Sequence, residues 1–198
     1  MKKLLVIALI LVMCISLCAC GGGDVAGTYK SVLWDTSYQL NDNNTYDKTS
    51  PKDSGTYETK GSGFALESKD GIVEEEFSKE GDYYYRTNLI CCFEEDEAYG
   101  IAPAFNDEGK TDQDFVAYYD TIDSSTYQYD VLILQLESDG TFKLRDCERR
   151  GYHQSEGTLY EGTYSLDGKN LNLNCDNGKT IPFLYINDCI YFDILTKQ

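Results

Sequence analysis

The chain has 198 residues, of which 34 are acidic and 17 are lysine or arginine, so its formal net charge is −17. A surface this acidic repels nucleic acid, which excludes DNA and RNA as partners. With 17 tyrosines and 8 phenylalanines, the chain is too aromatic for a disordered protein and can bury a substantial core.

Residues 1–19 have the parts of an export signal. Lys2 and Lys3 precede an apolar run over residues 4–17, and small residues follow it. A charged start, a short apolar core and small residues at its end are typical of a secretory signal. The run is shorter than the roughly 20 residues that a transmembrane helix needs. We therefore predict a cleaved signal peptide over residues 1–19 rather than a permanent membrane span.

The end of this segment, Leu17-Cys18-Ala19-Cys20, resembles the lipobox of bacterial lipoproteins. The resemblance implies that Cys20 receives a diacylglyceryl group, that cleavage falls before it, and that acyl chains such as palmitate hold the protein in a membrane. Two acyl chains are enough for stable anchoring. It further implies a location on the extracytoplasmic face of the cell membrane, with residues 20–24 as a short lipid-anchored tether. Loss of Lys2 and Lys3 takes the formal charge from −17 to −19.

Five cysteines follow the proposed lipidation site. An exported protein can form disulfides, and an odd number leaves at least one thiol without a partner inside the chain. No pair has the CxxC spacing of a metal or redox site, so we expect no metal site. Most free cysteines behave as small buried apolar residues. The disulfide pairing stays open among Cys91, Cys92, Cys147, Cys175 and Cys189.

The rest of the chain contains two related copies of one pattern. Gln39-Leu40 and Thr45-Tyr46 recur 96 residues later as Gln135-Leu136 and Thr141-Phe142. Gly55-Thr56-Tyr57 recurs 107 residues later as Gly162-Thr163-Tyr164, so 11 extra residues lie between these marks in the second copy.

These marks predict the domain organisation. We expect a first β repeat over residues 25–90, a loop-rich connector over 91–115, and a second β repeat over 116–198. The start of the first repeat, Val25-Ala26, is matched with Val116-Ala117 of the second.

Each copy reads as a series of hairpins. Asp139-Gly140 lies between two alternating segments and is a strong hairpin dipeptide. Leu171 and Leu173 alternate with asparagine at the period of two that a half-buried strand requires. The last hairpin of each copy is expected to pair residues 72–78 with 83–87, and residues 180–186 with 189–195. No convincing helical period is present, so the fold class is all-β.

A meander of hairpins must cover its apolar faces and pair its edges. Closure into a barrel, or two sheets packed face to face as a β-sandwich, meets both needs. Gly27-Thr28-Tyr29-Lys30, then Leu40 with Asp42 and Thr45-Tyr46, then Gly55-Thr56-Tyr57, resemble small secreted lipoproteins with lipocalin-like domains. The resemblance implies a lipocalin-like barrel.

No catalytic constellation is present, and we predict neither enzyme activity nor a cofactor. Any Ser-His-Asp or Cys-His arrangement would need His153, the single histidine. It lies in the extra 11 residues beside Arg149 and Arg150. This segment is either a basic binding loop or a solvated hairpin tip, and we favour the tip because most polar loop residues only solubilise.

The tyrosine runs at 83–85 and 118–119 should alternate across a strand. One side would then be buried, and the other would pair across strands or form an exposed aromatic strip. We expect a membrane-anchored binding lipoprotein that holds a small apolar or sugar-like ligand or a protein partner. The alternative is a structural or interaction lipoprotein of the cell envelope with no small-molecule site.

Overall fold

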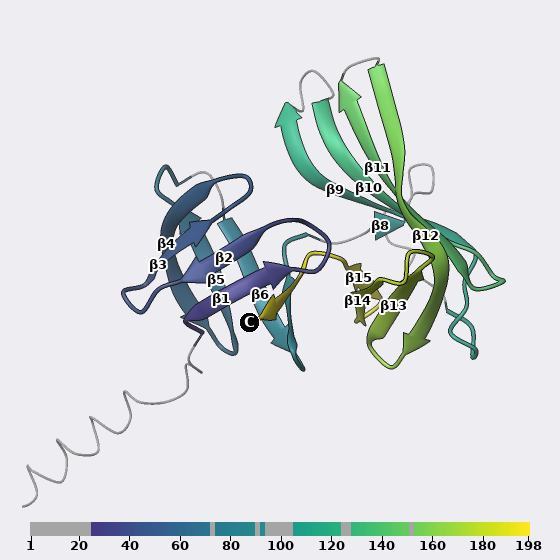
Figure 1. Cartoon of the computed structure of the whole chain (residues 1–198), viewed down its shortest axis with the longest axis horizontal. Helices are drawn as coiled ribbons and strands as arrows, with labels where there is room; N and C mark the ends of the chain where they lie inside the picture. Colours follow the sequence, from purple (N-terminus) through teal and green to yellow (C-terminus); the bar gives the residue numbers. More distant parts are fainter. Residues whose placement is uncertain (1–24, 72–73, 90–91, 94–104, 124–127, 151–152) are drawn as a thin grey trace, which may run out of the picture.

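The structure is a computed structural model that describes residues 25–71, 74–89, 92–93, 105–123, 128–150 and 153–198. All regular elements in these ranges are β-strands, and all strand pairs are antiparallel, which confirms the predicted all-β fold. The strands form two bodies, a closed barrel and a curled open sheet that has the shape of a half-barrel (Figure 1).

The closed barrel contains the first seven strands of the chain and the last one. Its strands follow one another around the barrel in the order β1-β16-β7-β6-β5-β4-β3-β2. Their bounds are β1 Gly27–Ser31, β2 Ser37–Leu40, β3 Thr45–Lys48, β4 Asp53–Lys60, β5 Gly63–Ser68, β6 Glu74–Glu80, β7 Tyr83–Arg86 and β16 Ile194–Lys197.

The open sheet contains the eight strands between them, in the order β15-β14-β13-β12-β11-β10-β9-β8. The strand β8 at one edge has only two residues. The bounds are β8 Cys92–Phe93, β9 Gln113–Asp123, β10 Gln128–Leu136, β11 Thr141–Arg150, β12 His153–Asp167, β13 Asn170–Cys175, β14 Thr180–Ile186 and β15 Cys189–Tyr191.

The repeated glycines mark positions where two strands come close. A Cβ atom at Gly55 would lie 1.9 Å from the carbonyl oxygen of Glu67, and one at Gly162 would lie 2.2 Å from that of Asn174. Both distances are far below any van der Waals contact, so only glycine fits. The sequence repeat therefore reflects the same close approach of two strands in the barrel and in the open sheet.

The strand register corrects the predicted alignment of the two repeats at their starts. Tyr29 on β1 pairs with Tyr38, and Phe115 on β9 pairs with Leu134, which is the residue 96 positions after Tyr38. Tyr29 and Phe115 are thus equivalent, and both are fully buried. The match of Val25-Ala26 with Val116-Ala117 is wrong, because the start carried too few marks to fix the offset.

The 11 extra residues of the second copy lengthen a hairpin. Strands β11 and β12 have 10 and 15 residues, against 4 and 8 in the equivalent strands β3 and β4. Arg150 pairs with His153 at the far end of this hairpin. His153 is therefore at a hairpin tip, and its side chain lies outside the described part of the structure.

The last predicted hairpin is only partly correct. Strand β14 pairs with β15 as expected, but β15 ends at Tyr191. The chain then crosses to the barrel, where Leu195 pairs with Ser31 of β1 and with Tyr84 of β7. Ile194 and Leu195 are fully buried there. Closing the barrel and burying these two side chains outweigh the extension of a local hairpin.

Aromatic side chains fill the barrel interior. The Tyr29 ring lies 5.1 Å from the Phe64 ring and 4.9 Å from the Tyr84 ring, and the Phe64 ring lies 5.0 Å from the Phe77 ring, between centroids. Such tilted and edge-on contacts add to the stabilisation from burial. The interior cluster consists of Val25, Tyr29, Tyr38, Leu40, Tyr46, Tyr57, Phe64, Leu66, Phe77, Tyr84 and Leu195.

The segment that connects β1 and β2 joins the barrel to the half-barrel. Leu33 is buried in the apolar core of the open sheet, and Val32 and Trp34 pack against that core. Tyr85 of the barrel contacts Tyr191 at 4.7 Å between ring centroids. The barrel therefore covers part of the concave face that the open sheet leaves unclosed.

Leu195 provides a test of the closing strand. Leu195→Ala should lower the free energy of unfolding by about 2–5 kcal/mol, because it leaves a cavity in the barrel. Thr196→Ala is the matched control on the outward face of the same strand and should change stability by no more than about 0.5 kcal/mol. Urea unfolding followed by circular dichroism measures both. Equal effects of the two variants would contradict the observed orientation of β16.

Candidate functional site

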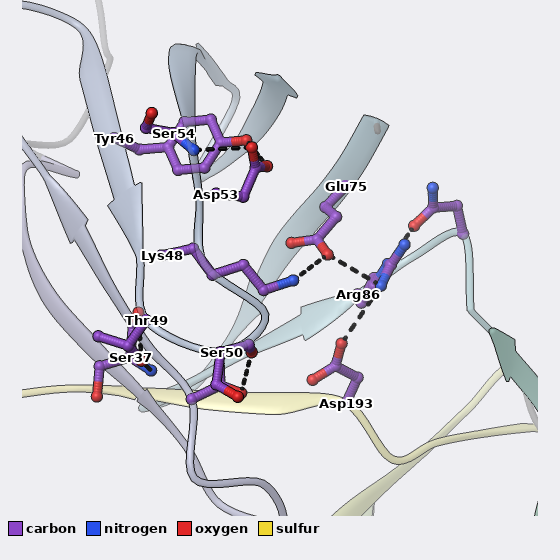
Figure 2. A network of polar contacts seen from close by, with 12 residues as sticks. Ser37, Tyr46, Lys48, Thr49, Ser50, Asp53, Ser54, Glu75, Arg86 and Asp193 are labelled. Atoms are coloured by element: carbon purple, nitrogen blue, oxygen red, sulfur yellow. Dashed lines mark hydrogen bonds and ion pairs between the residues drawn. The ribbon is translucent and has the colours of Figure 1, made fainter. Parts of the chain in front are cut away.

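Four charged side chains meet at one end of the barrel interior. Each lies two positions from a buried core residue of its strand, so it faces the interior as that residue does. Lys48 follows Tyr46 on β3, and Arg86 follows Tyr84 on β7. Glu75 precedes Phe77 on β6, and Asp193 precedes Leu195 at the start of β16. Figure 2 shows the four side chains pointing toward one another. We call these four residues the barrel-end cluster.

Glu75 is the centre of the barrel-end cluster. Its Oε1 atom lies 2.8 Å from Lys48 Nζ and 3.2 Å from Arg86 Nη1. Arg86 Nη1 is also 3.8 Å from Asp193 Oδ2, and the Arg86 backbone N–H donates to the Asp193 carbonyl at 3.0 Å. Two cations face two carboxylates, so the cluster neutralises its own charge.

The cluster is largely withdrawn from solvent. The exposed fractions of the side chains are 4% for Glu75, 7% for Asp193, 11% for Lys48 and 19% for Arg86. Within the described residues, Glu75 Oε2 has no hydrogen-bond donor. Pairing of this kind is weak evidence for net stability, but removing one partner from it is costly because a buried charge is left uncompensated.

Burial alters the acidity of the groups around Glu75. It raises the pKa of Asp193 to about 6, against the lowering effect of Arg86 and with a further rise from Glu75. Burial also raises the pKa of the Tyr38 hydroxyl well above its usual range, and the nearby carboxylates of Glu75 and Asp193 add to this rise. Tyr38 is therefore a neutral phenol at every physiological pH.

A second polar pair borders the same interior. The Tyr46 hydroxyl donates to Asp53 Oδ2 at 2.5 Å. Burial is the main reason that the pKa of Tyr46 is raised, and the Asp53 carboxylate adds to it. Both hydroxyls stay protonated, and that of Tyr46 is held by its hydrogen bond to Asp53.

The barrel has two open hollows. One, of about 300 Å³, lies over β4, β5 and β6 around the small side chain of Ala65, and Glu58, Lys60 and Glu76 line it. The other, of about 490 Å³, lies over β1, β2 and β3 and includes Gln39. Both are open, and exposed side chains line them together with more buried ones, Glu75 in the first hollow and Tyr38 and Lys48 in the second. The barrel interior itself is occupied by the aromatic cluster.

The structure describes the side chains of three of the cysteines that the sequence analysis considered. Cys147 and Cys175 are buried, Cys189 is partly exposed, and none of the three is part of a disulfide within the described residues. Burial raises the pKa of Cys175, so this thiol is unreactive. Cys20 and Cys91 lie outside the described residues, and the side chain of Cys92 is not described.

The structure also describes the tyrosine run at 83–85. Tyr84 is buried while Tyr83 and Tyr85 are half-buried, as the alternation across β7 predicts. Tyr83 and Tyr85 pack against Ile194 and the half-barrel and do not form a free aromatic strip. Within the described ranges, no group of three or more histidine, cysteine or acidic side chains is placed to hold a metal ion.

The barrel-end cluster has no clear signature in the sequence. The signal that was available is a charge at an inward position next to apolar residues. Glu75 is two residues from Phe77, and Asp193 lies between Phe192 and Ile194. Such a residue needs a partner, but the alternation alone cannot say which lysine or arginine supplies it.

Comparisons with protein-family models, curated proteins and solved structures found no match for this chain. No helix among the described residues is long and apolar enough to cross a membrane.

Glu75→Gln tests the central carboxylate. The substitution leaves Lys48 and Arg86 facing each other without it, so the free energy of unfolding should fall by about 3–5 kcal/mol. Glu76→Gln, on the outward face of the same strand, should change it by no more than about 0.5 kcal/mol. Urea unfolding at neutral pH compares them, and a Glu75→Gln protein as stable as Glu76→Gln would refute the role of the cluster.

Asp193→Asn tests the pH dependence. The folded pKa of Asp193, about 6, lies above the usual value of an unfolded aspartate, so the folded state binds the extra proton. Its contribution to stability therefore increases by about 1 kcal/mol from pH 7 to pH 5. Asp193→Asn should remove this increase, as measured by urea unfolding at both pH values.

Asp139→Asn is the matched control for this measurement. Asp139 is exposed, and its pKa is lowered because Thr141 donates hydrogen bonds to it. Any stability it contributes is lost only below about pH 4. This variant should therefore keep the increase in stability that the native protein shows from pH 7 to pH 5, and loss of the increase in both variants would argue against Asp193 as its source.

Proposed function

We propose that this protein is a lipid-anchored binding lipoprotein on the extracytoplasmic face of a cell membrane, and that it binds a protein partner through its outer surface. The filled barrel is the observation that favours a protein partner over a small ligand. Tyr29, Phe64 and Tyr84 are in mutual ring contact where a lipocalin-like carrier would hold its ligand. Small-molecule sites are generally concave and bury most of the ligand surface.

The charged end of the barrel supports the same proposal. A ligand that entered beside Glu75 would have to separate it from Lys48 or Arg86, which are its partners at 2.8 and 3.2 Å. Breaking a buried pair of this kind is costly. The barrel-end cluster therefore acts as a seal that holds strands together, and recognition is left to the outer faces of the sheets.

The anchor is proposed from the Leu17-Cys18-Ala19-Cys20 motif. Three glycines and Asp24 would separate the lipid from the start of the barrel near Gly27. A tether of this length keeps the barrel within short reach of the membrane surface. The strongly negative net charge disfavours contact with anionic head groups.

Cys20→Ala tests the anchor. The variant should lose metabolic labelling with palmitate, stay at the mass of the uncleaved chain, and change its distribution between membrane and soluble fractions. Cys189→Ala is the control, because Cys189 is a partly exposed cysteine in the second repeat, far from the lipobox in sequence, and this variant should be labelled and processed normally. A Cys20→Ala protein that is still cleaved and labelled would refute the anchor.

Native mass spectrometry of the purified protein tests the binding mode. We expect the bare protein mass with no co-purifying small molecule, and a complex with an envelope protein after incubation with a membrane extract. A retained small molecule of defined mass would contradict the filled barrel and restore the carrier interpretation.

A further inference from the structure

Strand β8 occupies in the open sheet the place that β16 occupies in the barrel. Tyr29 and Phe115 are equivalent residues of the two repeats. On the side away from the following strand, Tyr29 pairs with Lys197 of β16, and Phe115 pairs with Phe93 of β8. Each position is thus filled in the same register and the same antiparallel direction.

Each of these strands follows the last strand of one repeat in the chain and pairs with the other repeat. Strand β8 follows β7, the last strand of the first repeat, and it pairs with β9 of the second. Strand β16 follows β15, the last strand of the second repeat, and it pairs with β1 and β7 of the first. The two halves therefore exchange their final strands within one chain.

Within the described residues, the contacts that hold the halves together are non-covalent, and the chain between Phe93 and Phe105 links the halves. β16 makes three residue pairs with β1 and three with β7. The Val32 backbone N–H donates to the Ile194 carbonyl at 2.9 Å. Lys169 Nζ lies 2.8 Å from Glu80 Oε1 across the two bodies. A half supplied by a second copy would offer all these contacts unchanged.

We propose that two copies of this chain also combine as a strand-exchanged dimer, in which β16 of one copy closes the barrel of the other. The contacts are the same in the monomer and in the dimer, so the balance depends on concentration. Within one chain, each half meets the other at an effective concentration in the millimolar range. Pairing between two chains competes with pairing within one chain when the protein concentration approaches that value. Because each copy is strongly negative, with a formal charge of −17 for the uncleaved chain, salt should favour the dimer.

Lys30 and Thr196 allow a direct test, because they pair across β1 and β16 at outward positions. Lys30→Cys protein and Thr196→Cys protein are mixed, unfolded in urea and refolded together at high protein and salt concentration, then oxidised. A disulfide between the two chains can form at this seam only if β16 of one copy lies against β1 of the other. The double variant in one chain, oxidised when dilute, checks that the two positions accept a disulfide.

The control replaces Lys30→Cys with Glu58→Cys, which puts an exposed thiol on β4, away from the seam. Native thiols such as Cys189 contribute the same background to both mixtures. We expect roughly tenfold more covalent dimer at the seam than in the control when refolding is concentrated, and a fall toward the control level on dilution. Equal yields in the two mixtures, or an equal yield when folded proteins are mixed without urea, would overturn the proposal.

Discussion

The closed barrel depends on one strand that the chain supplies last. Without β16, the edges of β1 and β7 would expose rows of backbone donors and acceptors, and the interior aromatic cluster would open to solvent. Leu195 completes this cluster, while Ile194 packs between the barrel and β14 of the half-barrel. Strand β16 thus closes the barrel and also holds the half-barrel against it. The structure of each half of the chain therefore depends on the other.

The barrel-end cluster follows from this closure. Inward positions at the end of the barrel are too close to solvent to be wholly apolar and too buried to carry a lone charge. Lys48, Glu75 and Arg86 come from the first repeat, and Asp193 arrives with the closing strand. The cluster is therefore complete only in the closed barrel. Its charges meet where the chain crosses from one body to the other, which links the electrostatics of the site to the topology of the fold.

The packing of the interior shapes the function that the fold can support. In the barrel, tyrosine and phenylalanine rings occupy the space that a carrier would keep for its ligand. In the half-barrel, Leu33 and its neighbours from the first repeat cover the apolar core. The inner surfaces of both bodies are therefore covered, either by their own core side chains or by the other body. This arrangement supports the proposed recognition of a protein partner through the outer faces of the sheets.

The sequence alone determined the local structure, because hairpins depend on neighbouring residues. Alternation placed Leu171 and Leu173 in a half-buried strand, Asp139-Gly140 set a turn, and Gly55 with Gly162 marked equivalent places in the two repeats. Only the tertiary structure decided where residues 194–197 belong and which cation faces Glu75. Pairing β16 with β1 joins opposite ends of the chain, and no periodicity records such a contact. The gain from closing the barrel and burying Ile194 and Leu195 exists only once all the other strands are in place.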